Sequence, residues 1–190
     1  DITCDNGEVG SLSTSNSLTY TGVFTPTAEV SDAANTCAIG TGWTDTAGNT
    51  GTGSTSSNYA IDGVDPTVTS VAMGDSVIKS GATSTVTVVL SEAVTSFSET
   101  DVNCATGSLG TMSVASDEVT WTATFTPTAT TDDDTNTCVV GTSWTDSAGN
   151  APEAGATSGN YDVDTIVPTM SISSSGVSSG DTSNDATITL

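Results

Sequence analysis

Residues 43–49, Trp43-Thr-Asp-Thr-Ala-Gly-Asn49, have a near-copy at residues 144–150, Trp144-Thr-Asp-Ser-Ala-Gly-Asn150. The two copies lie 144 − 43 = 101 residues apart. Their surroundings match as well, because a cysteine precedes each copy (Cys37 and Cys138) and an Asn-Tyr pair follows each. A fixed period of about a hundred residues predicts an array of small, similar domains.

The repeat divides the chain into three parts. Residues 1–62 match residues 101–164 nearly throughout, so they are predicted to form the C-terminal part of one repeat. Residues 63–164 are predicted to form a complete repeat. Residues 165–190 are predicted to contain the first strands of the next one, because Pro168-Thr-Met-Ser-Ile-Ser parallels Pro66-Thr-Val-Thr-Ser-Val. A sequence that begins inside a domain suggests a piece of a longer or processed chain.

Apolar and polar residues alternate within the complete repeat. Val86, Val88 and Leu90 fall on one face of a segment whose other face carries Thr, and residues 119–125 alternate in the same way. This pattern is typical of half-buried antiparallel strands. Seven strands are expected, at 67–73, 83–90, 101–105, 109–115, 118–126, 136–143 and 157–163. The predicted fold is all-β, with tandem immunoglobulin-like β-sandwiches that repeat every 101–102 residues.

The composition narrows the choice of partners. The chain has one basic residue, no His and 23 acidic residues, which gives a formal net charge of −22. Nucleic acid and anionic membrane surfaces both require Lys and Arg, so neither is expected as a partner. No apolar run is long enough to cross a bilayer, so direct membrane insertion is not expected. The acidity suits either cation binding or simple solubility.

The cysteines form two pairs, Cys4 with Cys37 and Cys104 with Cys138, separated by 33 and 34 residues. One pair per repeat predicts one disulfide per domain, which in the complete repeat joins the third strand to the sixth. Disulfides indicate an oxidising, extracellular environment. A four-cysteine zinc site is the competing interpretation, but the C-x2-C spacing of such sites is absent.

Several motifs follow one another in a characteristic order. They are Pro66-Thr-Val-Thr-Ser-Val, Ser91-Glu-Ala-Val94, Trp121-Thr-Ala-Thr-Phe-Thr-Pro127, Trp144-Thr-Asp-Ser-Ala-Gly-Asn150, and Asp164 with Pro168 after it. In this order they resemble the bacterial Ig-like repeats of giant cell-surface adhesins, including the extender regions of RTX-type adhesins. The resemblance implies tandem β-sandwiches secreted by bacteria and often stiffened by calcium at domain junctions. The cysteine pair departs from that family pattern and leaves open a covalently reinforced filament.

The immunoglobulin topology also suggests where calcium would bind. The loop after the second strand, the loop after the sixth strand and the incoming linker all lie at the end where the chain enters the domain. Calcium takes six to eight oxygen ligands, and carboxylates and amides from these segments could supply them. An ordinary Asp-Gly-Asn turn is the alternative. The predicted ligands are Asp62, Asp65, Glu92, Asp101, Asp146 and Asn150, with Asp45 and Asn49 in the first domain and Asp164 at the next junction.

The function expected from these features is structural. We predict a non-enzymatic segment of a long extracellular bacterial protein, either an adhesin extender or a surface filament, whose partners are neighbouring repeats and other copies. One variant is a filament subunit in which the strands of 168–190 complete residues 1–62 of a neighbouring molecule. A carbohydrate- or ice-binding sandwich is the alternative, the latter because Thr120, Thr122, Thr124 and Thr126 face outward. Without His or Arg, no catalytic triad is expected.

Overall fold

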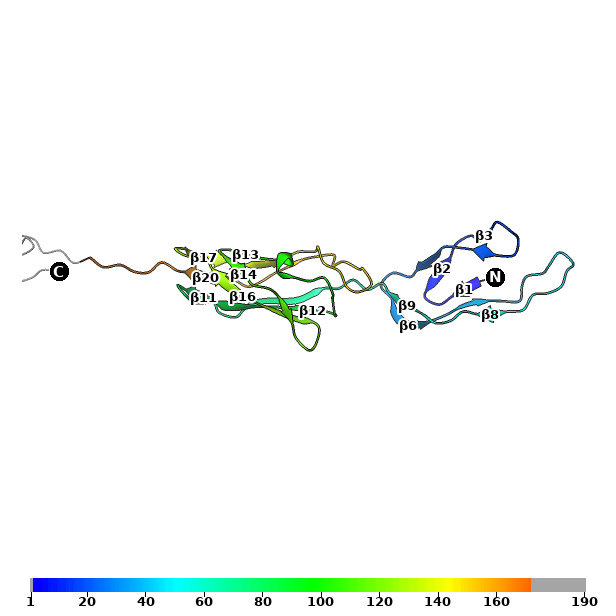
Figure 1. Cartoon of the computed structure of the whole chain (residues 1–190), viewed down its shortest axis with the longest axis horizontal. Helices are drawn as coiled ribbons and strands as arrows, with labels where there is room; N and C mark the ends of the chain where they lie inside the picture. The colour runs from blue at the N-terminus through cyan, green and yellow to red at the C-terminus, as the bar shows by residue number, and fades with distance from the viewer. Residues whose placement is uncertain (1, 172–190) are drawn as a thin grey trace, which may run out of the picture.

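The computed structural model describes residues 2–171, which form two β-domains arranged end to end along one axis (Figure 1). Residues 2–62 form the first domain and residues 68–164 the second. A short linker, residues 63–67, connects them. The second domain is a sandwich of two β-layers, as the alternation of its sequence predicts.

The first layer of the second domain is antiparallel throughout. The strands β10 (Val68–Met73), β12 (Ser84–Leu90), β16 (Thr120–Pro127) and β14 (Gly107–Leu109) follow one another in that order, and β15 (Ser113–Val114) also pairs with β16. The long strands β12 and β16 form its centre. Their facing positions, such as Val86 with Ala123 and Val88 with Trp121, place apolar side chains on the same inner face.

The second layer is built from shorter strands in two groups. The first group has the order β11 (Val77–Lys79), β20 (Tyr161–Asp164), β17 (Asp132–Asn136). The second has the order β13 (Val102–Cys104), β18 (Cys138–Val140), β19 (Ala156–Thr157), with the 3-10 helix η1 (Glu99–Asp101) leading into β13. Strand β11 runs parallel to β20, and the other pairs are antiparallel.

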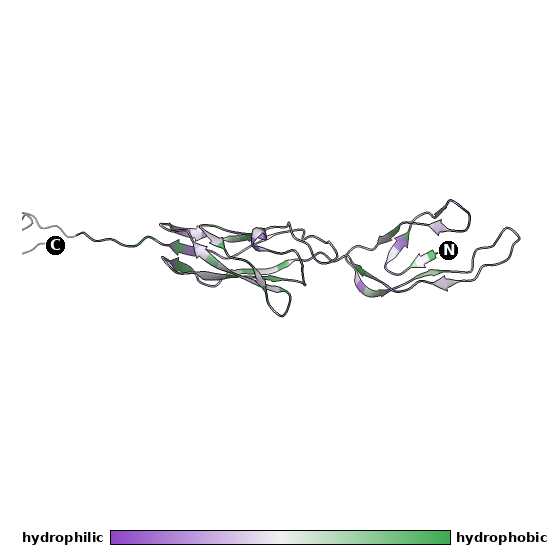
Figure 2. Ribbon diagram, viewed as in Figure 1, coloured by the Kyte–Doolittle hydropathy of each residue, from purple (hydrophilic) through white to green (hydrophobic). Residues whose placement is uncertain are grey.

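The core of the second domain lies between these layers. Val86, Val88 and Phe125 are fully buried, and Val140 and Val163 meet them from the second layer. Trp121 and Trp144 are both buried and both pack edge-on against Phe97, so both belong to the core. Figure 2 shows the corresponding alternation of apolar and polar residues along the strands.

The first domain repeats part of this plan. Its main sheet has the order β5 (Phe24–Pro26), β2 (Gly7–Val9), β1 (Ile2–Cys4), β7 (Cys37–Ile39), β8 (Ser54–Thr55). Two small sheets pair β3 (Ser13–Thr14) with β4 (Tyr20–Thr21) and β6 (Ser31–Asn35) with β9 (Tyr59–Asp62). Among the described residues, this domain has no counterparts of β10, β11 and β12.

Four details of the predicted strand pattern were wrong. Asp132, Asp133 and Asp134, which fall between two predicted strands, lie in β17, whose backbone pairs with β20 while these residues remain exposed or half-exposed. The predicted strand at 109–115 is split into β14 and β15, and the one at 157–163 is split into β19 and β20, which belong to different sheets. Strand β11 was not predicted at all, because three residues are too few to show an alternation. The predicted strands at 165–190 lie largely outside the described residues.

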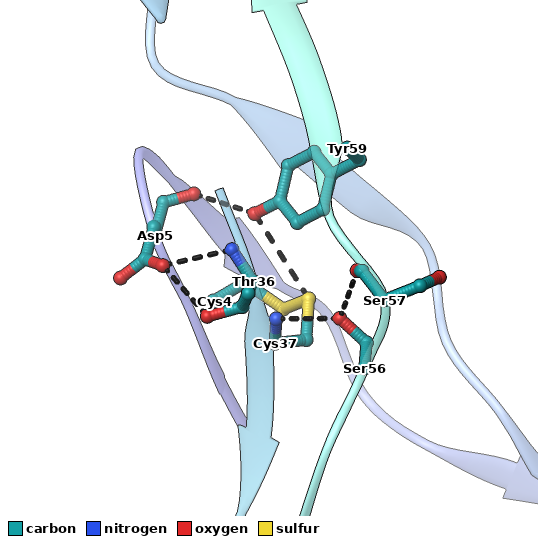
Figure 3. Close-up of a disulfide and its surroundings, with 7 residues drawn as sticks. All are labelled: Cys4, Asp5, Thr36, Cys37, Ser56, Ser57 and Tyr59. Atoms are coloured by element: carbon teal, nitrogen blue, oxygen red, sulfur yellow. Dashed lines mark hydrogen bonds between the residues drawn. A yellow bond between two sulfur atoms is a disulfide. The ribbon is translucent and has the colours of Figure 1, made fainter. Parts of the chain in front are cut away.

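Both disulfides form as the cysteine spacing predicts. Cys4 bonds to Cys37 and Cys104 bonds to Cys138, with Cα–Cα distances of 4.0 and 3.9 Å. In each case the two cysteines face each other on paired antiparallel strands, so the second bridge joins the third predicted strand to the sixth. A tyrosine packs beside the bridge in the first domain, where Tyr59 donates a hydrogen bond to the carbonyl of Asp5 (Figure 3). No cysteine is left to bind zinc.

A buried asparagine closes a bulge in β17. The pairing register of β17 with β20 shifts between Asp133 and Asn136. The Asn136 side chain, 1% exposed, donates to the carbonyls of Asp133 and Tyr161, and Thr106 donates to its Oδ1. Asn35 occupies the matching position in the first domain and donates to two equivalent carbonyls. Both domains therefore share this buried asparagine contact as well as their apolar core positions.

Helix is almost absent from the described part of the chain. Its 3-10 turn has three residues, and no helix in residues 2–171 has the length and apolar character needed to cross a membrane.

Candidate metal centre

Three acidic side chains meet where the first domain joins the second. Asp62 is the last residue of β9, Glu92 lies just after β12, and Asp146 lies in the loop that follows β18. One carboxylate oxygen from each lies within 4.8 Å of the others. The predicted convergence of the linker with two loops of the second domain is therefore present in the fold, at the junction seen in the middle of Figure 1.

Asp146 is held by its own loop. Its Oδ1 accepts hydrogen bonds from the backbone amides of Ala148, Gly149 and Asn150 at 2.7–2.9 Å. Gly149 has a φ of +100°, which a glycine adopts without strain and other residues rarely do. The motif Trp-Thr-Asp-Ser-Ala-Gly-Asn thus turns the chain so that three amides orient one carboxylate. An antiparallel bridge to Val94 ties this loop to the one that carries Glu92.

Asn150 connects the two domains directly. Its Nδ2 donates to Asp146 Oδ2 at 2.8 Å and to the backbone carbonyl of Asp62 at 3.0 Å. This amide was expected to supply a metal ligand, and here its nitrogen serves as a hydrogen-bond donor. Its Oδ1 remains the only atom of the side chain that could coordinate a cation. The sequence could not predict the hydrogen bond from Asn150 to the Asp62 carbonyl or the bridge between Val94 and Asp146. Both depend on how the loops that carry these residues approach each other in the fold.

The electrostatics of the three carboxylates are unequal. Burial alone would raise the pKa of Asp146, but hydrogen bonds from the Asn150 side chain and from the loop amides outweigh it, so its pKa is lowered. For Glu92, burial raises the pKa, and the negative charges of Asp62 and Asp146 raise it further. Glu92 is therefore the member of the cluster whose ionisation its surroundings oppose.

No basic side chain offsets this charge. The single basic residue of the sequence is Lys79. It lies in β11, where it is paired in register with Asp164 at the end of the second domain away from the junction (Figure 1). Clustered carboxylates without a counter-charge repel one another, and a bound cation relieves that repulsion.

The donor set fits a hard cation. All three ligand atoms are carboxylate oxygens, which calcium and magnesium prefer. Zinc and other softer metals favour imidazole or thiolate, and the sequence has no His while every cysteine is in a disulfide. Calcium accepts an irregular arrangement of ligands, whereas magnesium demands a near-ideal octahedron, and this suits a site assembled from two domains.

Two further predicted ligands lie outside the cluster. Asp65 is half-buried in the linker but has no carboxylate oxygen in the group. Asp101 belongs to η1, where its Oδ2 accepts hydrogen bonds from the backbone and the hydroxyl of Ser98. This capping contact occupies the Asp101 carboxylate within its own turn.

The remaining predicted ligands lie at equivalent positions of the repeat, away from the cluster. Asp45 and Asn49 form the same loop in the first domain: Asn49 donates to Asp45 Oδ2 at 2.8 Å, which lowers the Asp45 pKa. Within residues 2–171 this loop meets no counterpart of Asp62 or Glu92, since 62 − 101 and 92 − 101 are both negative. Asp164, the counterpart of Asp62, is exposed at the end of β20.

Comparison with known proteins gives one match. A family model described as a bacterial Ig-like domain matches residues 1–61 and, separately, residues 62–163. No curated protein and no solved structure matches the chain.

Proposed function

Because the chain belongs to the bacterial Ig-like domain family, we propose that it is a structural, non-enzymatic segment of a long extracellular bacterial protein. Two consecutive family matches, joined end to end, suit an adhesin extender or a surface filament, whose task is to hold other parts at a distance. A disulfide in each domain supports a location outside the cytoplasm, because such bonds persist in oxidising compartments.

We further propose that calcium at the domain junction makes this segment stiff. Asp62 would hold the ion from the first domain, and Glu92 and Asp146 would hold it from the second. The ion would neutralise three repelling carboxylates and fix the two domains relative to each other, so that a flexible string of domains becomes a rod. The observation that carries the proposal is the approach of these carboxylates to within 4.8 Å from two domains.

Thermal melting of the chain in calcium, in magnesium and in chelator tests this proposal. A site with a Kd of roughly 10⁻⁴ M gains about 2 kcal/mol at about 2 mM calcium, which raises the midpoint by roughly 5–10 °C. Asp146→Asn should abolish the gain. Asp134→Asn is the matched control, since it removes the same charge from an exposed site in the same domain and should keep the gain. Equal midpoints in calcium and in chelator would refute the metal site.

A further inference from the structure

The two layers of the second domain differ in charge. The strands of the first layer, β10, β12, β14, β15 and β16, contain no charged residue. The strands of the second layer carry five aspartates, three in β17 and two in β20, and also Lys79 in β11. One sheet is thus neutral in a chain whose formal net charge is −22. Because the centres of protein interfaces are depleted in charged residues, the neutral sheet is the part of this domain best suited to contact another protein.

The outward side chains of the neutral sheet form a regular array of hydroxyl and methyl groups. Strand pairing places Thr85 opposite Thr124 and Thr87 opposite Thr122 at the centre of the sheet. Ser113 extends the second of these rows across β15. All of these side chains are exposed or half-exposed. We call this array the threonine face, and its members are Thr85, Thr87, Ser113, Thr122, Thr124 and Thr126.

One carboxylate borders the threonine face. Asp117, in the loop between β15 and β16, accepts a hydrogen bond from the hydroxyl of Thr120 at 2.7 Å. Thr120 is the first residue of β16, so this charge lies beyond one end of the face. The face therefore has a neutral centre and a charged border, which is the layout that protein interfaces commonly have.

The charge distribution favours a second copy of this chain as the occupant. Two copies with a net charge of −22 each repel one another when they approach through their acidic surfaces. The threonine face allows the second domains to meet without bringing carboxylates together. Sheets pack face to face at about 10 Å with their strands nearly aligned, and a two-fold axis lets a single face serve both partners.

We propose that the threonine face packs against the threonine face of a second copy and joins two chains side by side. The two copies run antiparallel in this arrangement. In the first domain, Glu8 lies opposite Thr25, at the place where the second domain has Ser108 opposite Thr126. The first domain extends from the second along the long axis of the molecule (Figure 1). Antiparallel copies place their first domains at opposite ends of the pair, which keeps Glu8 out of the contact.

The size of the face sets the strength of the contact. Four strands about 4.8 Å apart, each with seven residues that rise about 3.3 Å, give roughly 440 Å² per copy. The pair would bury about 900 Å² in total, less than the roughly 1,200 Å² of a stable complex and within the range of transient ones. The second domains should therefore associate weakly and reversibly.

Sedimentation equilibrium tests this contact at chain concentrations up to about 1 mM, where an interaction with a millimolar Kd is populated. The runs contain chelator, so that calcium cannot bridge the carboxylates of two copies. They also contain about 1 M NaCl, which shortens the Debye length to about 3 Å. The mean mass should rise with concentration toward that of a dimer, and it should rise less at low salt, where the acidic chains repel each other. Since the test involves neither calcium nor stiffness, its failure would leave the proposed function untouched.

Three variants locate the contact on the threonine face. Thr124→Asp places a charge near its centre and should weaken the dimer at least about tenfold. Thr157→Asp adds the same charge to an exposed threonine in β19 of the second layer, and it should leave the association unchanged. A mixture of Thr124→Asp with Thr124→Lys should associate more strongly than either variant alone, because opposite charges then meet across the two-fold axis. Circular dichroism checks that each variant is folded.

A monomer at every concentration in high salt would overturn the proposal. If that monomer were retained by an insoluble neutral polysaccharide through Thr124, the polysaccharide would be the occupant and the second copy would be excluded. Equal effects of Thr124→Asp and Thr157→Asp would also overturn the proposal, because the association would then not use the threonine face.

Discussion

At the scale of single residues, the junction sets two carboxylates in opposite environments. Asp146 accepts hydrogen bonds from three loop amides and from Asn150, and its pKa is lowered. Glu92 is half-buried and faces two other acids, and its pKa is raised. One group is thus already stabilised as an anion, while the other needs a positive charge that the described protein does not provide.

Glu92→Gln should therefore have opposite effects with and without calcium. In chelator at pH 7 the variant should melt a few degrees higher than the parent chain, because it removes an anion that burial and repulsion disfavour. In calcium it should melt lower, because a ligand is lost. Paired melts in the two buffers test this. If Glu92→Gln melted lower than the parent chain in both buffers, Glu92 would contribute to packing and not to cation binding.

The pH dependence of the calcium-free chain follows from the same residue. Below the unfolded-state pKa, Glu92 is protonated in both states and contributes nothing. As the pH rises through the interval between the unfolded and the raised folded pKa, the unfolded state ionises first, so the folded state loses stability. The unfolding free energy of the parent chain should thus fall, relative to that of Glu92→Gln, as the pH rises over this interval. A difference that does not change with pH would contradict the raised pKa.

Asn136 is the residue whose loss should cost most among the polar groups of the second domain. Its buried side-chain amide donates hydrogen bonds to the carbonyls of Asp133 and Tyr161 and accepts one from the Thr106 hydroxyl. Asn136→Ala would leave these buried groups unpaired, at about 2–4 kcal/mol. Denaturant unfolding measures the loss. The exposed neighbour Thr135→Ala serves as control and should change stability by less than about 0.5 kcal/mol. A cost for Asn136→Ala as small as that of the control would show that water replaces the amide.

Sequence patterns located part of the junction site. Asp62, Glu92 and Asp146 could be placed together because loops at one end of a sandwich converge whatever their detailed shape. Asp65 and Asp101 could not be excluded from the predicted ligand set by the sequence alone. Local contacts orient such side chains, as the hydrogen bonds from Ser98 do for Asp101 in η1, and sequence periodicity does not reveal these contacts.

At the scale of elements, the strands that were predicted well are those with a long alternation. Strands β12 and β16 have seven and eight residues and match their predicted positions closely. Strand β11 has three residues, and β17 is rich in Asp, which is uncommon in strands. Both are stabilised by pairing with β20 rather than by their own sequence, so only the tertiary structure shows them.

The Cys104–Cys138 bridge should contribute strongly to the second domain. It joins paired strands and closes a loop of 34 residues, for which chain entropy predicts about 3–4 kcal/mol. Cys104→Ala/Cys138→Ala should lower the unfolding free energy by about that amount in a denaturant titration. The loss is measured relative to the oxidised parent chain, and the reduced parent chain is titrated beside it. A loss below about 1 kcal/mol would contradict this, because it would mean that the bridge removes little conformational entropy from the unfolded chain.

At the scale of the whole molecule, the charge and the repeat act together. A formal charge of −22 on 190 residues opposes close approach of one copy to another and of neighbouring acidic loops within a copy. In the proposed function, a cation bound at the junction would reduce this repulsion where the two domains meet. The family match to both segments, the end-to-end arrangement and the shared carboxylate cluster together support a stiff spacer.

The most direct test of that claim is small-angle X-ray scattering on the monomer fraction from a sizing column, in calcium and in chelator. In calcium the chain should scatter as an extended rod with a defined maximum dimension. In chelator, and for Asp146→Asn in either buffer, the distance distribution should broaden and its mean should shorten, because the two domains move about residues 63–67. Superimposable curves in calcium and in chelator would contradict a junction stiffened by calcium.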